Sequence, residues 1–213
     1  MRVVCLADTH ARHLDVTVPE GDLLAFAGDA CEDGTLEELR AFGRWLAALP
    51  HPHKVVIAGN NDRPFEGDEA ALARAIIEDA GALYLEETGA EVGGLRVYGH
   101  PWTPWPNQKA FSLPRGSAVL AEKHAAIPPG LDLLLVHGPP HGLLDKTEEG
   151  RRTGCELLAE RLAALDGAAP RAVVYGHIHE GHGVTRRGGT LYVNAAVCDA
   201  QEQPAHAPVV LDL

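Results

Sequence analysis

Five short apolar segments, each ending abruptly at Gly, Asp, Asn or His, constrain the fold more than any other feature of this sequence. They are rich in Val, Leu and Ala and do not alternate with polar residues, which is typical of strands buried on both faces. The five predicted strands are Arg2–Ala7, Leu23–Ala27, Val55–Ala58, Leu131–Val136 and Ala172–Tyr175. Between them, apolar residues at helical spacing predict helices over Thr35–Leu49, Asp68–Asp79 and Gly154–Leu165.

The order of these segments predicts the architecture. Strands that alternate with helices indicate a layered α/β fold. The second half of the chain adds predicted strands near Ala82–Leu85, Leu95–Gly99, Thr190–Val193 and Pro208–Leu211, and its later hairpin-like stretches predict a second, mixed sheet. No linker, charge run or internal repeat divides the 213 residues, so we expect a single domain over residues 1–213.

Composition restricts the class of protein and partner. Hydrophobic residues make up 46% of the chain, and no apolar run approaches the length of a membrane span. Met1 leads directly into the first predicted strand, and the four cysteines show no C-x-x-C spacing. We therefore expect a cytoplasmic protein with reduced thiols and no membrane partner. With 18 basic and 30 acidic residues, a net charge of −12 disfavours long nucleic acids, although metal ions can attract small anions locally.

Polar residues that can bind metals follow all five strands. The motifs are D-x-H at 8–10, G-D at 28–29, G-N at 59–60, H-G at 137–138 and G-H-x-H at 176–179. The carboxyl ends of strands in α/β sheets are where ligand crevices form. A lone Asp after a strand is usually a cap or turn residue, but five such motifs in order indicate a metal centre. The predicted metal ligands are Asp8, His10, Asp29, Asn60, His137, His177 and His179.

The predicted ligands suit a particular chemistry. Two carboxylates, one amide and four imidazoles favour Mn²⁺, with Fe or Zn as alternatives, over Ca²⁺ or Mg²⁺. Two divalent ions, two aspartates and a bridging hydroxide leave the centre about one unit positive, which attracts a phosphate ester. Two such ions roughly 3.5–4 Å apart can share one water and direct hydroxide at phosphorus.

At these motifs the sequence resembles the calcineurin-like metallophosphoesterases, and most closely the brain protein 239 family and its bacterial relatives. The supporting stretches are Tyr98–Gly116, His137–Pro140, Leu143–Lys146, Gly176–Gly183, and Asn194-Ala195 with Cys198. The resemblance runs from Val3 to Leu211. It implies a four-layer αββα sandwich, an α+β sandwich of two mixed β-sheets flanked by helices.

The resemblance also implies a function, the hydrolysis of small phosphodiesters such as cyclic nucleotides by a metal-bridging hydroxide. It implies that Asp8, His10 and His179 bind one metal, Asn60, His137 and His177 the other, and that Asp29 bridges them. A phosphomonoesterase or nucleotidase would use the same metals, and a nucleotide-binding regulator with weak turnover is a third interpretation. The partner is in each case a small phosphate ester or nucleotide.

One residue departs from the family pattern. The family motif is G-N-H-[DE], whereas this chain has Gly59-Asn60-Asn61-Asp62. An Asn can donate a hydrogen bond to a phosphoryl oxygen but cannot deliver a proton, and losing a general acid costs about 10²–10⁴-fold in rate. We therefore expect a preference for diesters with acidic leaving groups, or a substitute acid. Asp62 is expected to orient Asn61 or its loop, or to stabilise a turn.

Other candidates carry less specific signals. The substitute acid is one of His100, His141 and His182, of which His182 is favoured because it follows His179 by three residues. Asn194 is a candidate support for a ligand loop, and Arg151 and Arg152 either contact phosphate or are solvated. The segment Pro101–Gly116 is either a Pro-braced connection or a substrate wall that includes Trp102 and Trp105.

Overall fold

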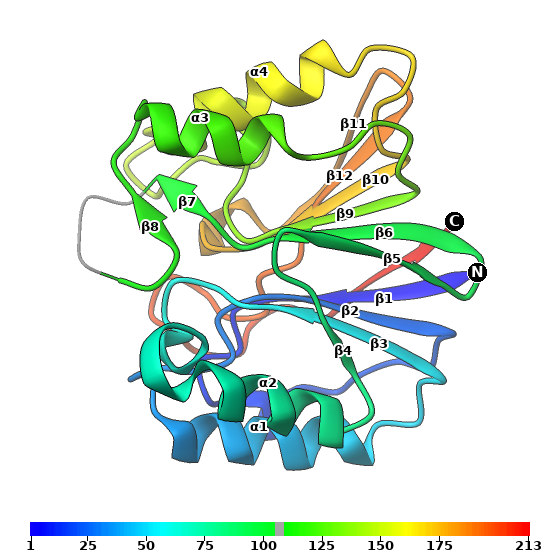
Figure 1. Ribbon diagram of the computed structural model, residues 1–213, viewed down its shortest axis with the longest axis vertical. Coiled ribbons are helices and arrows are strands. Elements are labelled where there is room, and N and C mark those ends of the chain that lie inside the picture. Colours follow the sequence, from blue (N-terminus) through cyan, green and yellow to red (C-terminus); the bar gives the residue numbers. More distant parts are fainter. Residues whose placement is uncertain (105–108) are drawn as a thin grey trace.

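Two β-sheets stacked face to face, each covered on its outer face by two helices, make up the molecule (Figure 1). The computed structural model describes residues 1–104 and 109–213. The first sheet has the order β13-β1-β2-β3-β4. Its strands are β1 (Arg2–Leu6), β2 (Leu23–Ala27), β3 (His53–Ile57), β4 (Leu83–Tyr84) and β13 (Val209–Asp212). Strands β1 to β4 are parallel, and β13 pairs antiparallel with β1.

The second sheet has the order β11-β12-β10-β9-β6-β5. Its strands are β5 (Thr88–Val92), β6 (Leu95–His100), β9 (Leu133–Val136), β10 (Ala172–Tyr175), β11 (Gly183–Arg187) and β12 (Thr190–Asn194). The four central strands are parallel, and the edge strands β5 and β11 are antiparallel to their neighbours. This confirms the predicted second, mixed sheet, whereas the strands predicted near Ala82–Leu85 and Pro208–Leu211, observed as β4 and β13, belong to the first sheet. A separate short pair joins β7 (Thr103–Pro104) to β8 (Ser112–Leu113).

The helices form the two outer layers. Helices α1 (Leu36–Ala48) and α2 (Ala70–Asp79) cover the first sheet, and α3 (Ala118–Ala125) and α4 (Glu156–Ala164) cover the second (Figure 1). Four 3₁₀ turns occur among the described residues: η1 (His13–Asp15), η2 (Arg63–Phe65), η3 (Gly67–Glu69) and η4 (His179–Gly181). The predicted four-layer αββα architecture is thereby confirmed. No helix within the described ranges is long and apolar enough to cross a membrane.

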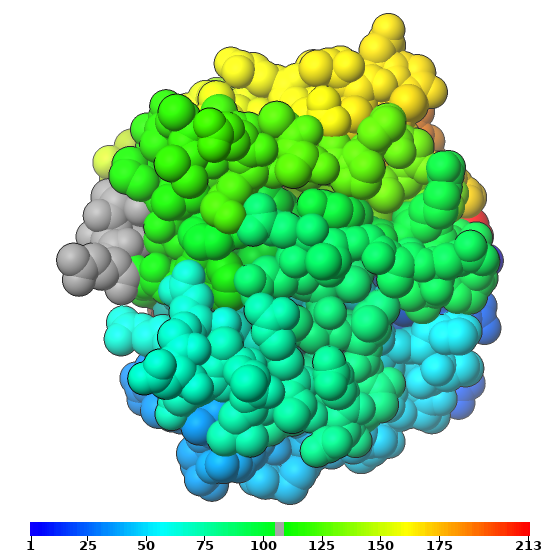
Figure 2. Space-filling view, in the orientation of Figure 1, coloured from blue at the N-terminus to red at the C-terminus, as the bar shows by residue number. Residues whose placement is uncertain are grey.

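Three layers of apolar side chains hold this arrangement together, and they explain why the strand sequences do not alternate. In β1, Val3 and Cys5 pack between the two sheets, while Val4 and Leu6 face the helices below. Both faces of the strand are therefore buried, so both sets of side chains are apolar. Figure 2 shows that residues from the middle of the chain, coloured cyan to green, cover most of the face on view.

The carboxyl ends of the central strands lie together at one end of the molecule. There the two sheets are joined directly, because the backbone N–H of Ala7 donates to the carbonyl of Ala195 at 2.9 Å. The loops that leave β1, β2, β3, β9 and β10 all begin at this end, and they carry the five polar motifs.

Candidate metal centre

Unusual backbone conformations place the polar side chains at the strand ends. Asp8, His10, Asp29 and His177 have positive φ angles of 55°, 43°, 57° and 67°. Residues with a Cβ seldom adopt this left-handed region, and when they do the surrounding structure must hold them there. The sharp turns at these strand ends therefore cost conformational free energy. Residues in such rarely populated backbone conformations are concentrated at functional sites.

Two motif glycines permit the close approach of the loops. A Cβ on Gly176 would overlap the carboxylate of Asp8, and a Cβ on Gly59 would overlap that of Asp29. Each glycine therefore leaves the space that an aspartate from a different strand occupies. This is the physical reason for the glycine in the G-N and G-H-x-H motifs.

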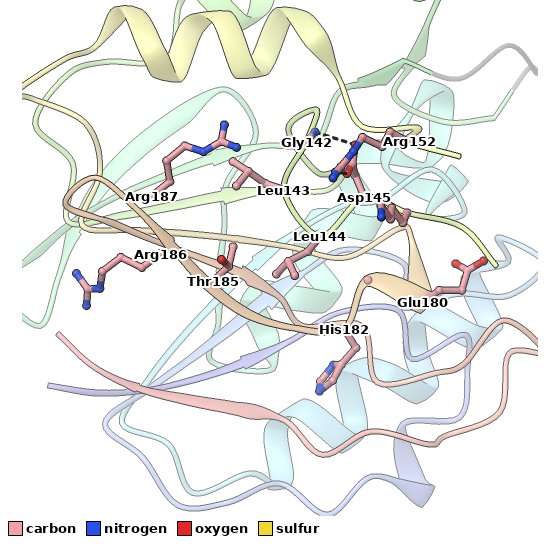
Figure 3. Close-up of a pocket in the computed structure, with 12 residues that line it drawn as sticks. Gly142, Leu143, Leu144, Asp145, Arg152, Glu180, His182, Thr185, Arg186 and Arg187 are labelled. Atoms are coloured by element: carbon pink, nitrogen blue, oxygen red, sulfur yellow. Dashed lines mark hydrogen bonds and ion pairs between the residues drawn. The ribbon is translucent and has the colours of Figure 1, made fainter. Parts of the chain in front are cut away.

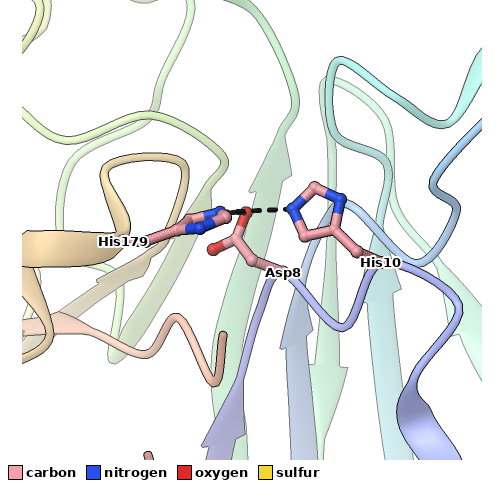
Figure 4. Close-up of side chains that lie close together, drawn as sticks. All are labelled: Asp8, His10 and His179. Atoms are coloured by element: carbon pink, nitrogen blue, oxygen red, sulfur yellow. Dashed lines mark hydrogen bonds and ion pairs between the residues drawn. The ribbon is translucent and has the colours of Figure 1, made fainter. Parts of the chain in front are cut away.

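The first group of side chains consists of Asp8, His10 and His179, whose ligand atoms all lie within 4.8 Å of one another (Figure 4). The Nε2 atoms of His10 and His179 face each other at 3.2 Å. Asp8 Oδ1 is buried, has no hydrogen-bond partner among the described residues and lies 3.8 Å from His179 Nε2. His179 Nδ1 donates to the carbonyl of Asp199 at 2.7 Å, which leaves Nε2 available as a ligand. This set of donors fits a divalent cation.

The second group consists of Asp29, His137 and His177, again with ligand atoms within 4.8 Å of one another. His137 Nδ1 donates to the carbonyl of Ala27 at 2.9 Å, so its Nε2 is the free ligand atom. That Nε2 lies 3.0 Å from Asn60 Oδ1. Asn60 Oδ1 thus lies beside this group, and its role as a metal ligand stays a prediction.

Asp29 lies between the two groups. Its Oδ1 is 3.4 Å from His137 Nε2 in the second group. Its Oδ2 is 3.9 Å from His10 Nε2 in the first group. One carboxylate oxygen therefore faces each group, which is the geometry a bridging ligand needs.

Electrostatic interactions in the centre favour positive charge beside the carboxylates. Burial would lower the pKa of His137, but the charge of Asp29 and the hydrogen bond to it raise the pKa to about 9. Burial also opposes protonation of His179, whose pKa is nevertheless raised to about 9 by Asp8. For His177, burial and the charge of His137 lower the pKa to about 3. The negative charges of Asp8 and Asp29 thus favour the binding of protons or cations between the two carboxylates and the neighbouring histidines.

Asp62 ties the ligand loops together. Its side chain is fully buried, and Oδ2 accepts hydrogen bonds from the backbone N–H groups of Asp29 and Gly59, both at 2.8 Å. Its Oδ1 accepts from the backbone N–H of Cys31 at 2.9 Å. Burial and the charge of Asp29 raise the pKa of Asp62 to about 7. These contacts join the loops of Asp29, Cys31 and Gly59, and the role of Asp62 in orienting Asn61 stays a prediction.

Asn61 lies against the carboxylate shared by the two groups. Its backbone N–H donates to Asp29 Oδ1 at 2.8 Å, and its Nδ2 donates to Asp29 Oδ2 at 2.9 Å. Its Oδ1 accepts a hydrogen bond from Lys109 Nζ at 2.5 Å. No sequence motif marks Lys109, although it lies within the distinctive stretch Tyr98–Gly116.

The three histidines considered as substitute acids lie elsewhere. His182 donates from Nδ1 to the carbonyl of Ala196 at 2.9 Å and stacks on His206. It borders a cavity of about 490 Å³, and in Figure 3 its ring points away from Arg152. His100 is fully buried, and His141 lies near Asp145. Within the described ranges, none of the three contacts Asn61, and their acid role stays a prediction.

The remaining candidates have structural contacts. Asn194 Nδ2 donates to the carbonyl of Ile178 at 2.7 Å and so supports the loop that carries His177 and His179. Arg151 is exposed, and Arg152 pairs with Asp145 at 2.6 Å.

The aromatic segment is partly packed into the fold. Trp102 packs edge-on against Phe111 and under Lys123, as a braced connection does. Trp105 lies outside the described residues.

A pair of glutamates also borders the centre. Glu32 and Glu202 have carboxylate oxygens within 4.8 Å of a ring nitrogen of His10. Glu32 Oε2 lies 3.4 Å from His10 Nδ1 but has no hydrogen-bond partner among the described residues, and Asn61 Nδ2 approaches the same ring nitrogen at 3.5 Å. Glu32 follows the G-D motif by three residues, but nothing in the sequence near Glu202 indicated this contact.

Comparison with known proteins assigns the family. The model of the calcineurin-like phosphoesterase family matches residues 1–181. The chain belongs to this family. Membership implies metal-dependent hydrolysis of phosphate esters, in a family that typically binds two divalent metals. The two groups of donors described above fit that requirement.

Relatives and solved structures agree with this assignment. The chain is 40% identical to "Metallophosphoesterase domain-containing protein 1" of Homo sapiens, over all of this chain and 71% of that protein. It is 35% identical to a UPF0046 protein of Caenorhabditis elegans, over all of this chain and 81% of that protein. The crystal structure of TT1561 of Thermus thermophilus has a similar fold, with a TM-score of 0.62 at 17% identity, over 91% of this chain and 88% of the other.

Proposed function

We propose that this calcineurin-like phosphoesterase hydrolyses small phosphodiesters with acidic leaving groups, and that it uses two divalent ions, preferably Mn²⁺. Asp8, His10 and His179 would hold one ion, and Asn60, His137 and His177 the other. The position of Asp29, with one oxygen toward each group, is the observation that carries this proposal. The mixture of imidazole, carboxylate and amide donors suits Mn²⁺, Fe or Zn.

The roles of the chain's own residues follow from their contacts. Two divalent ions supply Lewis acidity and lower the pKa of a bound water. Asp199 and Ala27 hold the rings of His179 and His137 so that Nε2 faces the centre. Asp62 fixes the loops of Asp29 and Gly59. These buried contacts keep the donor atoms in place before a substrate arrives, which reduces the reorganisation that the reaction requires.

The preference for diesters with acidic leaving groups rests on Asn61. A side-chain amide cannot protonate the departing oxygen, so an oxygen that leaves readily as an anion is hydrolysed more easily. In addition, Asn61 Nδ2 already donates to Asp29, which leaves the amide poorly placed to serve the leaving group. A nucleotide-binding role with weak turnover is the second candidate, and it rests on the same residue.

The test compares two classes of ester on the Mn²⁺-loaded protein. An aryl phosphodiester, the matching monoester and an alkyl diester with a poorer leaving group are assayed after chelation and reloading. We expect Mn²⁺-dependent turnover that is fastest for the aryl diester. Exclusive turnover of the monoester would contradict the diester preference, and tight nucleotide binding without turnover would support the regulator.

Two variants test the metal assignment. Asp29→Asn removes the charge between the two groups, and His137→Ala removes one imidazole, so both are expected to lower kcat/KM by at least about 100-fold. His53→Ala is the matched control, because His53 lies outside both groups at the amino end of β3 and is partly exposed. Retained activity in Asp29→Asn would refute the bridging role.

A further inference from the structure

A lysine lies beside the one residue of the centre that departs from the family pattern. Lys109 Nζ donates to Asn61 Oδ1 at 2.5 Å, and Asn61 Nδ2 in turn donates to Asp29 Oδ2 at 2.9 Å. The ammonium group is thus linked through a single side-chain amide to the carboxylate that faces both groups of metal ligands.

The backbone around Lys109 is fixed to the same loop. The N–H of Ala110 donates to the carbonyl of Asn60 at 3.0 Å. Phe111 is 1% exposed, and its N–H donates to Glu66 Oε1 at 3.2 Å. Lys109 itself stays partly exposed. The residues that follow it are therefore anchored in the core, and its side chain extends over the rim of the centre toward Asn61.

The partner of Lys109 is a neutral side chain. Other basic side chains, such as Arg74, Arg115 and Lys123, form ion pairs with carboxylates. Within residues 1–104 and 109–213, Lys109 has no ion pair and contacts a neutral amide. An ammonium group has three donors, and Asn61 uses one of them. The other two donors and the full positive charge remain available to an anion.

We propose that Lys109 binds a non-bridging oxygen of the substrate's phosphoryl group, and that Asn61 is the residue that positions it. This inference rests on the function proposed above and deepens it. Asn61 holds the ammonium beside Asp29 through its Oδ1, since its Nδ2 is committed to that carboxylate. The lysine thus places a positive charge beside Asn61, the residue that stands where the family pattern has a histidine. Charge that develops on phosphoryl oxygens is stabilised by such a fixed donor.

The test combines a binding measurement with kinetics. Lys109→Met keeps most of the side-chain length but removes the charge, and Lys109→Arg keeps the charge. Orthophosphate is titrated into the Mn²⁺-loaded proteins by calorimetry, and kcat and KM are measured with an aryl diester. We expect Lys109→Met to weaken phosphate binding by about 10-fold and to lower kcat/KM by about 10–100-fold. Lys109→Arg is expected to restore most of both quantities.

A double-mutant cycle tests the positioning role of Asn61. Asn61→Ala is expected to reduce phosphate binding in wild type but to change little in the Lys109→Met background, since residues that act together are not additive. Arg44→Met is the control, because it removes an equal charge from the exposed part of α1. Mn²⁺ affinity and the melting temperature of each variant show whether the centre and the fold are intact.

The outcomes separate the two proposals. If wild type hydrolyses no ester, the proposed function fails, and the phosphate titration still decides the role of Lys109. Phosphate affinity of Lys109→Met within two-fold of wild type would overturn the inference, whatever the turnover. Additive losses in the double mutant would overturn the positioning role of Asn61 and leave Lys109 as an independent phosphate contact.

Discussion

At the scale of single residues, a buried histidine outside the metal motifs links stability to pH. His124 on α3 is 1% exposed, packs against the His100 ring at a tilt of 50°, and lies with Nε2 3.2 Å from Cys155 Sγ. Burial lowers its pKa to about 4. In the unfolded chain a histidine titrates near 6.5, so between these values the unfolded state binds the proton more tightly. The stability that His124 contributes is therefore present above about pH 6.5 and is lost as the pH falls toward 4.

Replacing His124 tests this linkage. The free energy of unfolding of wild type is expected to decrease as the pH is lowered from about 6.5 toward 4. His124 contributes at most about 3 kcal/mol to this decrease. His124→Leu is expected to be less stable at pH 7.5, because it loses the contact with Cys155, but to show a shallower pH dependence. Urea unfolding at several pH values from 4.5 to 7.5 measures both slopes. An equal slope in the two proteins would show that His124 is not buried in its neutral form.

Residue types at strand ends could be read from the sequence, whereas contacts between distant loops could not. The motifs at Asp8, Asp29 and His137 are local, because each directly follows an apolar segment. Lys109 lies 48 positions from Asn61 and has no motif of its own. Glu202 approaches His10 only because the two sheets meet at the same end. Such contacts are made by tertiary packing, which a local sequence pattern does not encode.

At the scale of elements, apolar residues at helical spacing were the signal that predicted α1, α2 and α4. Helix α1 begins after Thr35, whose Oγ1 accepts from the N–H of Glu38, while Glu38 accepts from the N–H of Thr35. Its buried face contains Leu39, Phe42 and Leu46 at helical spacing. Helix α3 was not predicted, because its eight residues bury only Leu120 and His124 and so show no stripe.

The capping box of α1 gives a direct test at this scale. Thr35→Ala removes the side-chain oxygen that satisfies the N–H of Glu38, so the free energy of unfolding is expected to fall by about 1 kcal/mol. Thr35→Ser keeps the oxygen and serves as the control, with little loss expected. Chemical unfolding of the three proteins gives the difference. Because α1 lies on the outer face of the first sheet, Mn²⁺ affinity should stay unchanged in both variants.

At the scale of the whole molecule, each group of donors combines residues from both sheets. Asp8 and His10 follow β1 of the first sheet, and His179 follows β10 of the second. In the other group, Asp29 follows β2, while His137 follows β9. A cation in either group would therefore connect the two halves of the sandwich at the end where they meet. A ligand that binds only this folded arrangement must stabilise it.

This connection predicts a metal-dependent melting temperature. At a free Mn²⁺ concentration of 100 times the dissociation constant, one site adds about 2.7 kcal/mol to the free energy of unfolding. For a chain of this size that corresponds to a rise of about 5–10 °C, measured by calorimetry after chelation and stepwise addition of Mn²⁺. Asp29→Asn weakens both groups at once and should lose most of this rise. Thr35→Ala should have a lower melting temperature without Mn²⁺ but show the same rise when Mn²⁺ is added. A full rise in Asp29→Asn would mean that Mn²⁺ stabilises the fold from a site other than the one between the sheets.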